Sequence, residues 1–222
     1  MTSFLFAGPR KAHVVLLLAP GAGASASSPW MDGMAARLGA AGSRVARFDF
    51  SYMAERERTG TRRPPPRAEA LVAEYQAAVE ALTANGEIEG GARLLIGGKS
   101  LGGRVASLAA QGLFDAGRIA GLICLGYPFH PPDKPQQLRT AHLETLSCPT
   151  LIVQGERDPF GGPSEVADYG LSPQISIHWA RDGDHDLKPR RSSGATLDGN
   201  LHEVVREIVR FAGKLDRDRP VV

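Results

Sequence analysis

Residues 94–106, LLIGGKSLGGRVA, decide the fold class of this 222-residue chain. The apolar run Arg93–Gly98 leads directly into Leu101–Leu113, a segment of small and apolar residues, which predicts a buried strand followed at once by a helix. Between them, residues 98–102 read Gly-Lys-Ser-Leu-Gly and match the G-x-S-x-G pattern. The pattern alone is weak, because a tight turn without chemistry can share it. Its position between strand and helix favours an exposed, reactive serine.

The rest of the chain repeats this alternation of short apolar runs and longer amphipathic ones. Continuously apolar strands suit a parallel sheet that is covered on both faces. We therefore expect an α/β fold, a doubly wound, mostly parallel sheet of about six to seven strands with helices on both faces, in one domain spanning residues 1–222. The expected strands are His13–Pro20, Arg44–Phe50, Arg93–Gly98, Gly121–Tyr127, Thr150–Gly155 and Ile175–Ala180.

Helices are expected near residues 29–38, 71–82, 101–113 and 197–215, where apolar residues recur at helical spacing. Ser28-Pro29 provides a helix cap and a first-turn proline for the first of these. Ser51–Arg67 contains three consecutive prolines and five arginines, so we expect a mobile surface excursion that could partly cover a site.

Composition excludes several functional classes. The net charge is only +2, from 26 basic and 24 acidic residues, which argues against nucleic acid and anionic membranes as partners. The N-terminal residues do not form a signal peptide, and the longest apolar run, Val14–Ala19, is too short to span a bilayer. Cys124 and Cys148 show no metal spacing. We expect a cytoplasmic protein with reduced thiols, no metal and no cofactor, of unknown oligomeric state.

A serine hydroxyl needs a base, and the base needs an acid to orient it. Asp158 follows the predicted strand TLIVQG, and His185 lies in the loop after the predicted strand ISIHWA. Because the carboxyl ends of parallel strands share one edge of the sheet, these residues can converge on Ser100. The sequence thus predicts Ser100 as nucleophile, His185 as base and Asp158 as orienting acid.

Other residues compete for these roles. Glu156 stands too close to the strand, and the Asp182, Asp184 and Asp186 run lacks the glycine and distal glutamate of a calcium loop. His130, in YPFHPP, could line the pocket and contact substrate. The remaining histidines are expected within strands (His13, His178) or on solvent-facing helices (His142, His202).

Acyl transfer also requires donors for the oxyanion. One should be the backbone N–H of Leu101, directly after the nucleophile. The other should come from the loop APGAGASASS, with Ala22 the first candidate and Gly23 the second. Lys99, beside the serine, is either a solvated charge or a contact to a substrate carboxylate.

Several stretches together resemble the α/β-hydrolase superfamily, and more narrowly the hydrolase-like domains of a testis-expressed protein and of a histone-acetyltransferase complex subunit. The resemblance implies a doubly wound sheet without a lid domain and an intact triad of Ser100, Asp158 and His185. It departs at Ala19-Pro20, where many relatives have His-Gly. The matching stretches are APGAGA, GGKSLGGR, ICLGYPFHPPDKPQQLR, HLETLSCPTLIVQGERDPF and IHWARDGDHDLKP.

The favoured function is hydrolysis of a small-molecule ester or thioester through an acyl-enzyme. One alternative is a non-catalytic interaction module on the same fold, since fold does not determine function. Another is a dinucleotide-binding protein, because Gly21-x-Gly23-x-x-Ala26 matches a relaxed fingerprint and Asp49 ends the next strand. Against it, Ser28-Pro29 starts the helix several residues beyond the glycines, away from a bound pyrophosphate.

Overall fold

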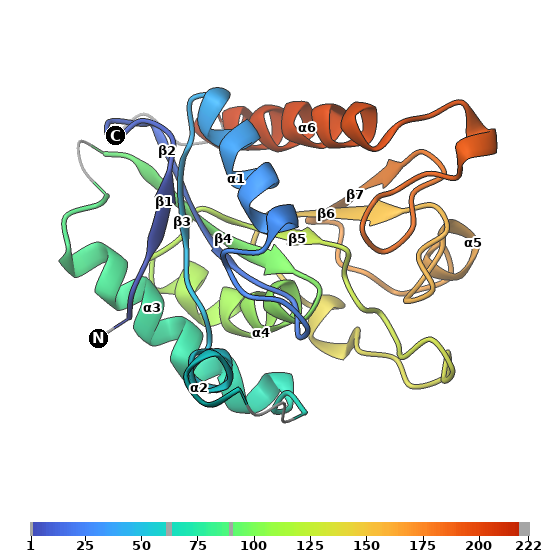
Figure 1. Cartoon of the computed structure of the whole chain (residues 1–222), viewed down its shortest axis with the longest axis horizontal. Helices are drawn as coiled ribbons and strands as arrows, with labels where there is room; N and C mark the ends of the chain where they lie inside the picture. Colours follow the sequence, from blue (N-terminus) through green and yellow to red (C-terminus); the bar gives the residue numbers. More distant parts are fainter. Residues whose placement is uncertain (1, 61–63, 89–90, 218–222) are drawn as a thin grey trace.

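A seven-stranded sheet forms the centre of the structure, a computed structural model that describes residues 2–60, 64–88 and 91–217 (Figure 1). The strand order is β1-β3-β2-β4-β5-β6-β7, and every neighbouring pair is parallel except β1 with β3. This confirms the predicted doubly wound, mostly parallel sheet. The strands are β1 (Leu5–Ala7), β2 (Val14–Ala19), β3 (Arg44–Arg47), β4 (Arg93–Lys99), β5 (Gly121–Leu125), β6 (Thr150–Gly155) and β7 (Ile175–Ala180).

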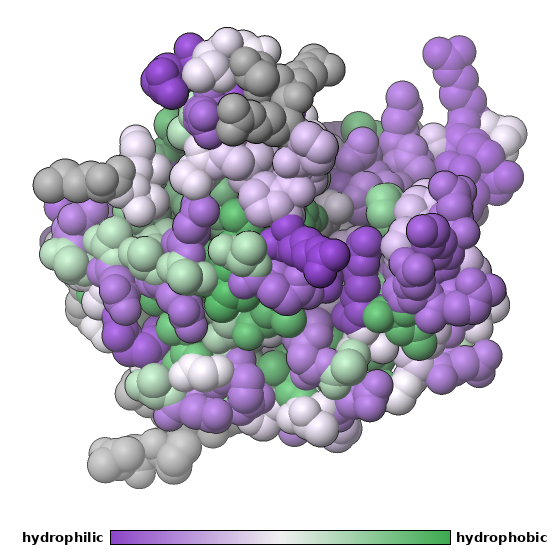
Figure 2. All heavy atoms as spheres, turned by 90° about the horizontal axis from the view of Figure 1, so that it is seen from below, coloured by the Kyte–Doolittle hydropathy of each residue, from purple (hydrophilic) through white to green (hydrophobic). Residues whose placement is uncertain are grey.

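Helices cover both faces of the sheet. α1 and α6 lie on one face and α3 and α4 on the other, and α2 lies on the same side as α3 (Figure 1). Seen from the side of α3 and α4, apolar side chains alternate with hydrophilic ones across the surface (Figure 2). The helices are α1 (Pro29–Ala40), α2 (Ser51–Thr59), α3 (Val72–Ala84), α4 (Leu101–Asp115), α5 (Pro163–Val166) and α6 (Leu197–Arg217). Short 3-10 turns occupy Ala68–Leu71, Ala141–Leu143 and Arg191–Ser193.

Strand β2 shows why the sheet needs two covering layers. Its residues are almost fully buried, and successive side chains point to opposite faces. Leu17 belongs to the apolar cluster under α3 and α4, whereas Leu16 and Leu18 belong to the cluster under α1 and α6. Burial of each such side chain contributes about 1.5–3 kcal/mol. A continuously apolar strand is therefore stable only between two layers of helices.

Two predictions about local structure were wrong. Ser51–Thr59 is helix α2 rather than a mobile excursion, ending at Gly60, which has φ +68° in the left-handed region. The prediction for residues 61–63 lies outside the described residues. Strand β1 was not predicted, because only three residues, LFA, form it and they are mostly exposed at the sheet edge.

Within the described residues, no helix combines the length and the apolar character that a membrane span needs.

Candidate active site

Ser100 stands at the corner where β4 ends and α4 begins. Its backbone has φ +48° and ψ −111°, a conformation that residues with a Cβ rarely adopt. The corner is held by the Ser100 N–H, which donates to the Leu125 carbonyl at 2.9 Å, and by the Ser100 carbonyl, which accepts from Arg104 N–H at 3.0 Å. Strained backbone of this kind persists only where its surroundings determine it, and it concentrates at functional sites.

Glycines on both sides of Ser100 allow the corner to form. A Cβ at Gly98 would lie 2.3 Å from the Ala19 carbonyl oxygen, and a Cβ at Gly102 would lie equally close to the same atom. Side chains at these positions would push α4 away from β2. The structure thus gives the physical reason for the clearance that the G-x-S-x-G pattern predicts.

Asp158 and His185 meet at the same edge of the sheet. They follow β6 and β7, which are paired in parallel, and His185 Nδ1 lies 2.8 Å from Asp158 Oδ2. The Asp158 carboxylate is fully buried and also accepts from Gln154 Nε2 at 3.0 Å and from the Phe160 N–H at 2.9 Å. These donors fix the carboxylate, and the carboxylate in turn orients the imidazole. The predicted contact between acid and histidine is therefore present.

A cavity of about 490 Å³ lies beside Ser100 and is also lined by His185. The structure shows no hydrogen bond between the Ser100 hydroxyl and the His185 ring. Such contacts are often long in ligand-free sites and tighten when substrate binds. Two larger hollows of about 720 Å³ lie elsewhere, and no histidine is among the described residues that line them. The other residues lining the cavity at Ser100 are Gly21, Ala22, Gly23, Ala24, Ser28, Pro29, Trp30, Met31, Lys99 and Asp186.

The loop with the expected oxyanion donors lies against the serine and is contacted from outside by α2. A Cβ built at Gly21 would be 3.6 Å from the Ser100 Cβ, which is ordinary contact distance. On the outer side, Tyr52 Oη donates to the Ala22 carbonyl and Arg56 Nη1 to the Gly23 carbonyl, each at 3.4 Å. Partial burial raises the pKa of Tyr52 to about 12, so its hydroxyl stays protonated. Part of the segment that could have covered the site, helix α2, instead contacts this loop.

Lys99 lines the cavity but is buried, with 9% of its side chain exposed. Its Nζ donates to the His185 carbonyl at 2.9 Å, pairs with Asp186 Oδ1 at 3.2 Å and faces the Trp30 ring at 5.5 Å. Burial lowers the pKa of Lys99, and Asp186 opposes that shift. The lysine therefore ties the loop that carries His185 to the strand that carries Ser100.

His130, the other predicted substrate contact, is buried in the loop after β5. It is 2% exposed, its Nδ1 lies 2.8 Å from the Pro131 carbonyl, and Nε2 faces Glu165 Oε1 at 3.5 Å. It is not among the residues lining the cavity at Ser100. The described ranges contain no group of three or more His, Cys, Asp or Glu side chains arranged to hold a metal.

A second serine–histidine pair lies further along α4 and was not predicted. Ser107 Oγ is 2.8 Å from His142 Nε2, so His142 does not face solvent as expected. Ser107 is 1% exposed, and its hydroxyl donates to the Arg104 carbonyl at 2.7 Å. Burial, assisted by Arg104, lowers the pKa of His142 to about 4. No pattern in the sequence predicts that the 3-10 turn that carries His142 packs against α4.

Comparisons with known proteins identify the family and the fold. A family model described as an alpha/beta hydrolase domain matches residues 12–213. A dienelactone hydrolase from Anabaena variabilis superposes with a TM-score of 0.70 at 19% identity, covering 94% of this chain and 91% of that one. A serine hydrolase without a lid from Xanthomonas campestris gives 0.68 at 18% identity, covering 100% and 91%. Est1E from Butyrivibrio proteoclasticus, with ferulic acid bound, gives 0.66 at 14% identity, covering 96% of each chain.

Proposed function

The chain belongs to the alpha/beta hydrolase domain family, and from this premise we propose that it is a serine hydrolase acting on small esters or thioesters. One observation carries the proposal. Ser100, strained at φ +48°, lines a cavity together with His185. The Nδ1 atom of His185 contacts the buried carboxylate of Asp158. A serine nucleophile, a base and an orienting acid are the groups that acyl transfer requires.

In the proposed mechanism, His185 Nε2 takes the proton from Ser100 Oγ as that oxygen attacks the substrate carbonyl carbon. The resulting tetrahedral intermediate collapses, the bond to the alcohol or thiol breaks, and His185 returns the proton to the leaving group. Water then attacks the acyl carbonyl carbon while His185 Nε2 takes its proton. As the bond from that carbon to Ser100 Oγ breaks, His185 returns the proton to Ser100 Oγ, and the acid leaves. The Asp158 carboxylate stabilises the imidazolium that forms in each half-reaction.

Two backbone N–H groups would bind the oxyanion. Leu101 N–H is at the first turn of α4, where the helix dipole adds positive potential. In the opposite loop, the carbonyl of Ala22 accepts from α2. The carbonyl and the following N–H of a trans peptide point in opposite directions, so the N–H of Gly23 is turned away from α2. This orientation favours Gly23 over Ala22 as the second donor.

The cavity favours a small, largely uncharged acyl group. Its walls are mainly small or apolar residues, and its two permanent charges, Lys99 and Asp186, pair with each other. Est1E, a structural relative, binds ferulic acid, which is also a small molecule. Within the family, the GGKSLGGR and YPFHPP segments lead us to propose membership of the narrower group shared by the testis-expressed protein and the acetyltransferase subunit.

The proposal is tested with a fluorophosphonate probe and a panel of p-nitrophenyl esters graded by acyl length. We expect the wild type to be labelled and to hydrolyse short esters, and Ser100→Ala to do neither while melting at nearly the same temperature. A wild type that neither reacts nor hydrolyses any ester would instead support the non-catalytic module. Thermal shift with NAD(H) and NADP(H) tests the dinucleotide alternative, for which the helix after Gly21 and Gly23 starts too late, at Pro29.

A further inference from the structure

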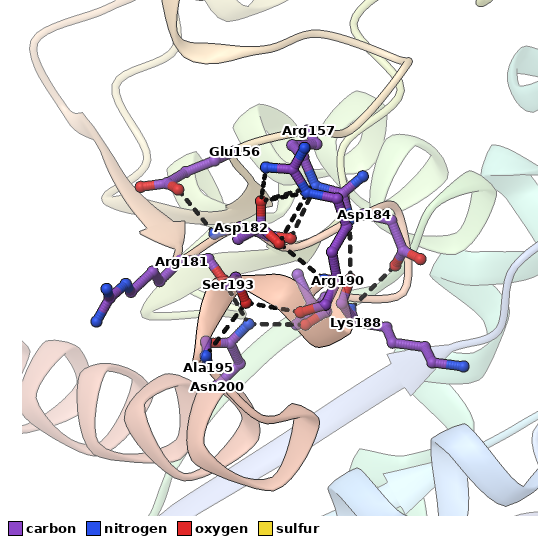
Figure 3. Close-up of polar contacts among 11 residues, drawn as sticks. Glu156, Arg157, Arg181, Asp182, Asp184, Lys188, Arg190, Ser193, Ala195 and Asn200 are labelled. Carbon is purple, nitrogen blue, oxygen red and sulfur yellow. Dashed lines mark hydrogen bonds and ion pairs between the residues drawn. The ribbon is translucent and has the colours of Figure 1, made fainter.

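A charged cluster outside the cavity joins the two loops that carry Asp158 and His185 (Figure 3). We define the acid loop as residues 156–162, after β6, and the base loop as residues 181–190, after β7. The cluster is centred on Asp182, with Arg157 from the acid loop and Arg190 from the end of the base loop. None of these three residues lines the cavity beside Ser100.

Asp182 is a non-glycine residue with φ +50° and is 8% exposed. Its carboxylate accepts from the Arg190 N–H at 2.7 Å and from Arg190 Nε at 2.9 Å, and Arg157 Nε lies 3.1 Å from Oδ1. These interactions, the Arg190 side-chain hydrogen bond foremost, lower the pKa of Asp182 to about 2. The carboxylate is therefore ionised at neutral pH, and its unusual backbone conformation is held by two arginines.

The main chain of the same segment is also bonded across the two loops. Arg157 Nε donates to the Asp182 carbonyl at 3.0 Å, and the Arg157 N–H donates to the Gly183 carbonyl at 2.8 Å. In the reverse direction, the Asp182 N–H donates to Glu156 Oε2 at 2.7 Å. Residues 156–157 and 182–183 are thus held as one unit (Figure 3).

Gly155, the last residue of β6, shows how closely the loops approach. A Cβ at this position would lie 2.3 Å from the Asp184 carbonyl oxygen and 2.4 Å from that of Gly183. The backbones approach closely three residues before Asp158 on one side and directly before His185 on the other. Movement of one loop relative to the other would change the distance between the Asp158 carboxylate and the His185 ring.

We propose that Asp182 and the two arginines bound to it, Arg157 and Arg190, are positioning residues, which hold the acid and base loops so that Asp158 and His185 keep their hydrogen bond. The inference rests on the proposed function of Ser100. These three residues do not line the cavity at Ser100, and they act through the backbone next to Asp158 and His185. Displacements of about 1 Å at a catalytic group can reduce rates by about 10²-fold, so a loosened pair of loops should lower turnover.

Asp182→Asn is the primary test. Asparagine tolerates a left-handed backbone, so the substitution removes the charge while keeping the conformation accessible. We expect kcat for a short p-nitrophenyl ester to fall about tenfold. KM should stay within about twofold, because the cavity walls come mostly from residues 21–31.

Arg190→Met, which removes side-chain donors to Asp182 but keeps Arg157, should give a smaller loss of kcat. Glu203→Gln on α6 is the control, since it breaks an exposed ion pair with Arg206 and should change neither constant.

Rates are expressed per active site, titrated with the fluorophosphonate probe, so that partial unfolding is not read as lost turnover. If Asp182→Asn only lowers the melting temperature and kcat per titrated site equals that of the wild type, the proposal is overturned. If Asp182→Asn does not fold, Arg190→Met decides by the same criterion.

A second measurement does not depend on turnover. A low-field proton resonance from the His185 Nδ1–H, assigned by its loss in His185→Gln, reports the hydrogen bond to Asp158. We expect it to shift upfield or broaden in Asp182→Asn and to stay unchanged in Glu203→Gln. An unchanged resonance in Asp182→Asn overturns the proposal. A wild type without esterase activity would end the proposed function, while this resonance would still test the connection between the loops.

Discussion

Helix α4 presents two serines, Ser100 at its start and Ser107 two turns later, and each is associated with a histidine from a distant segment. Ser107 and His142 are hydrogen-bonded, whereas Ser100 and His185 share a cavity without a direct bond. By proximity to a histidine alone, Ser107 would be the better candidate nucleophile. Its burial and the direction of its hydrogen bonds argue for Ser100 instead.

The two serine–histidine pairs differ in which ring nitrogen of the histidine carries the hydrogen. The Ser107 hydroxyl has one hydrogen and donates it to the Arg104 carbonyl, so the hydrogen shared with His142 must come from the Nε2–H of the ring. A ring nitrogen that donates to the serine cannot accept its proton. At Ser100, by contrast, Asp158 contacts His185 Nδ1 and leaves Nε2 free to act as base. Tautomer and burial therefore distinguish the proposed catalytic pair, Ser100 and His185, from the hydrogen-bonded pair Ser107 and His142.

The largest expected effect separates the two serines by activity. Ser100→Ala should lower kcat/KM for a short ester by at least about 10³-fold, because loss of the nucleophile removes the covalent route. Ser107→Ala should stay within about threefold of the wild type, since it removes only two buried hydrogen bonds of about 1 kcal/mol each. Initial rates at matched folded concentration check both. The reverse ranking would assign the chemistry to Ser107 and end our assignment.

The acid provides the next test. Asp158→Asn should lower kcat about 10²- to 10⁴-fold, because an amide at this position favours the wrong tautomer of His185. His142→Gln is the matched change at the second pair and should leave kcat unchanged. Steady-state kinetics on the same ester compare them. Equal losses in both variants would mean that both histidines serve catalysis.

Glycine substitutions should change stability in opposite directions at the two serines. Relative to alanine at the same position, Ser100→Gly relieves the strain at φ +48° and should stabilise the fold by about 1 kcal/mol. Ser107→Gly lies inside α4 and should destabilise it by about 1 kcal/mol relative to Ser107→Ala. Urea unfolding of the four variants measures both differences. Shifts of the same sign would show that the corner at Ser100 stores no strain.

The smallest expected effect is a pH dependence of stability at the second pair. Burial lowers the pKa of His142 in the folded protein to about 4, below its ordinary value of 6.5. Between these values the unfolded chain binds a proton that the folded protein does not, so the free energy of unfolding falls as pH decreases from about 6.5 to about 4. His142→Gln should show a shallower decline than the wild type over this range, with His202→Gln on the surface of α6 as control. Parallel curves for His142→Gln and the wild type would contradict the prediction.

The sequence was most informative where one physical requirement dominates. Short, mostly apolar runs in the sequence predicted all six of the longer strands. They are recognisable because a parallel sheet between two helical layers must bury both of its faces. The glycines around Ser100 identified the corner, because contacts such as Gly98 with Ala19 leave no space for a side chain. The contact between Asp158 and His185 followed from their positions after adjacent strands.

Features that depend on distant contacts could not be predicted. Among the side chains of helix α2 that the structure describes, Met53 is the one that is fully buried, and the charged sequence of the helix resembles a loop, although Gly60 was a possible stop signal. The burial of Lys99 depends on Asp186, and the position of His142 depends on Ser107, each about 35 or more residues away. Sequence periodicity carries no information about such pairings.

The contact at Gly155 has a consequence for experiments that substitute every position in turn. Any larger side chain there would separate the backbones at Gly183 and Asp184, so the whole set of nineteen replacements should score as inactive. Such a result would look the same as a result at Ser100, although Gly155 is not among the residues that line the cavity beside Ser100. The positions required for the proposed activity would therefore include residues whose only contribution is to be small.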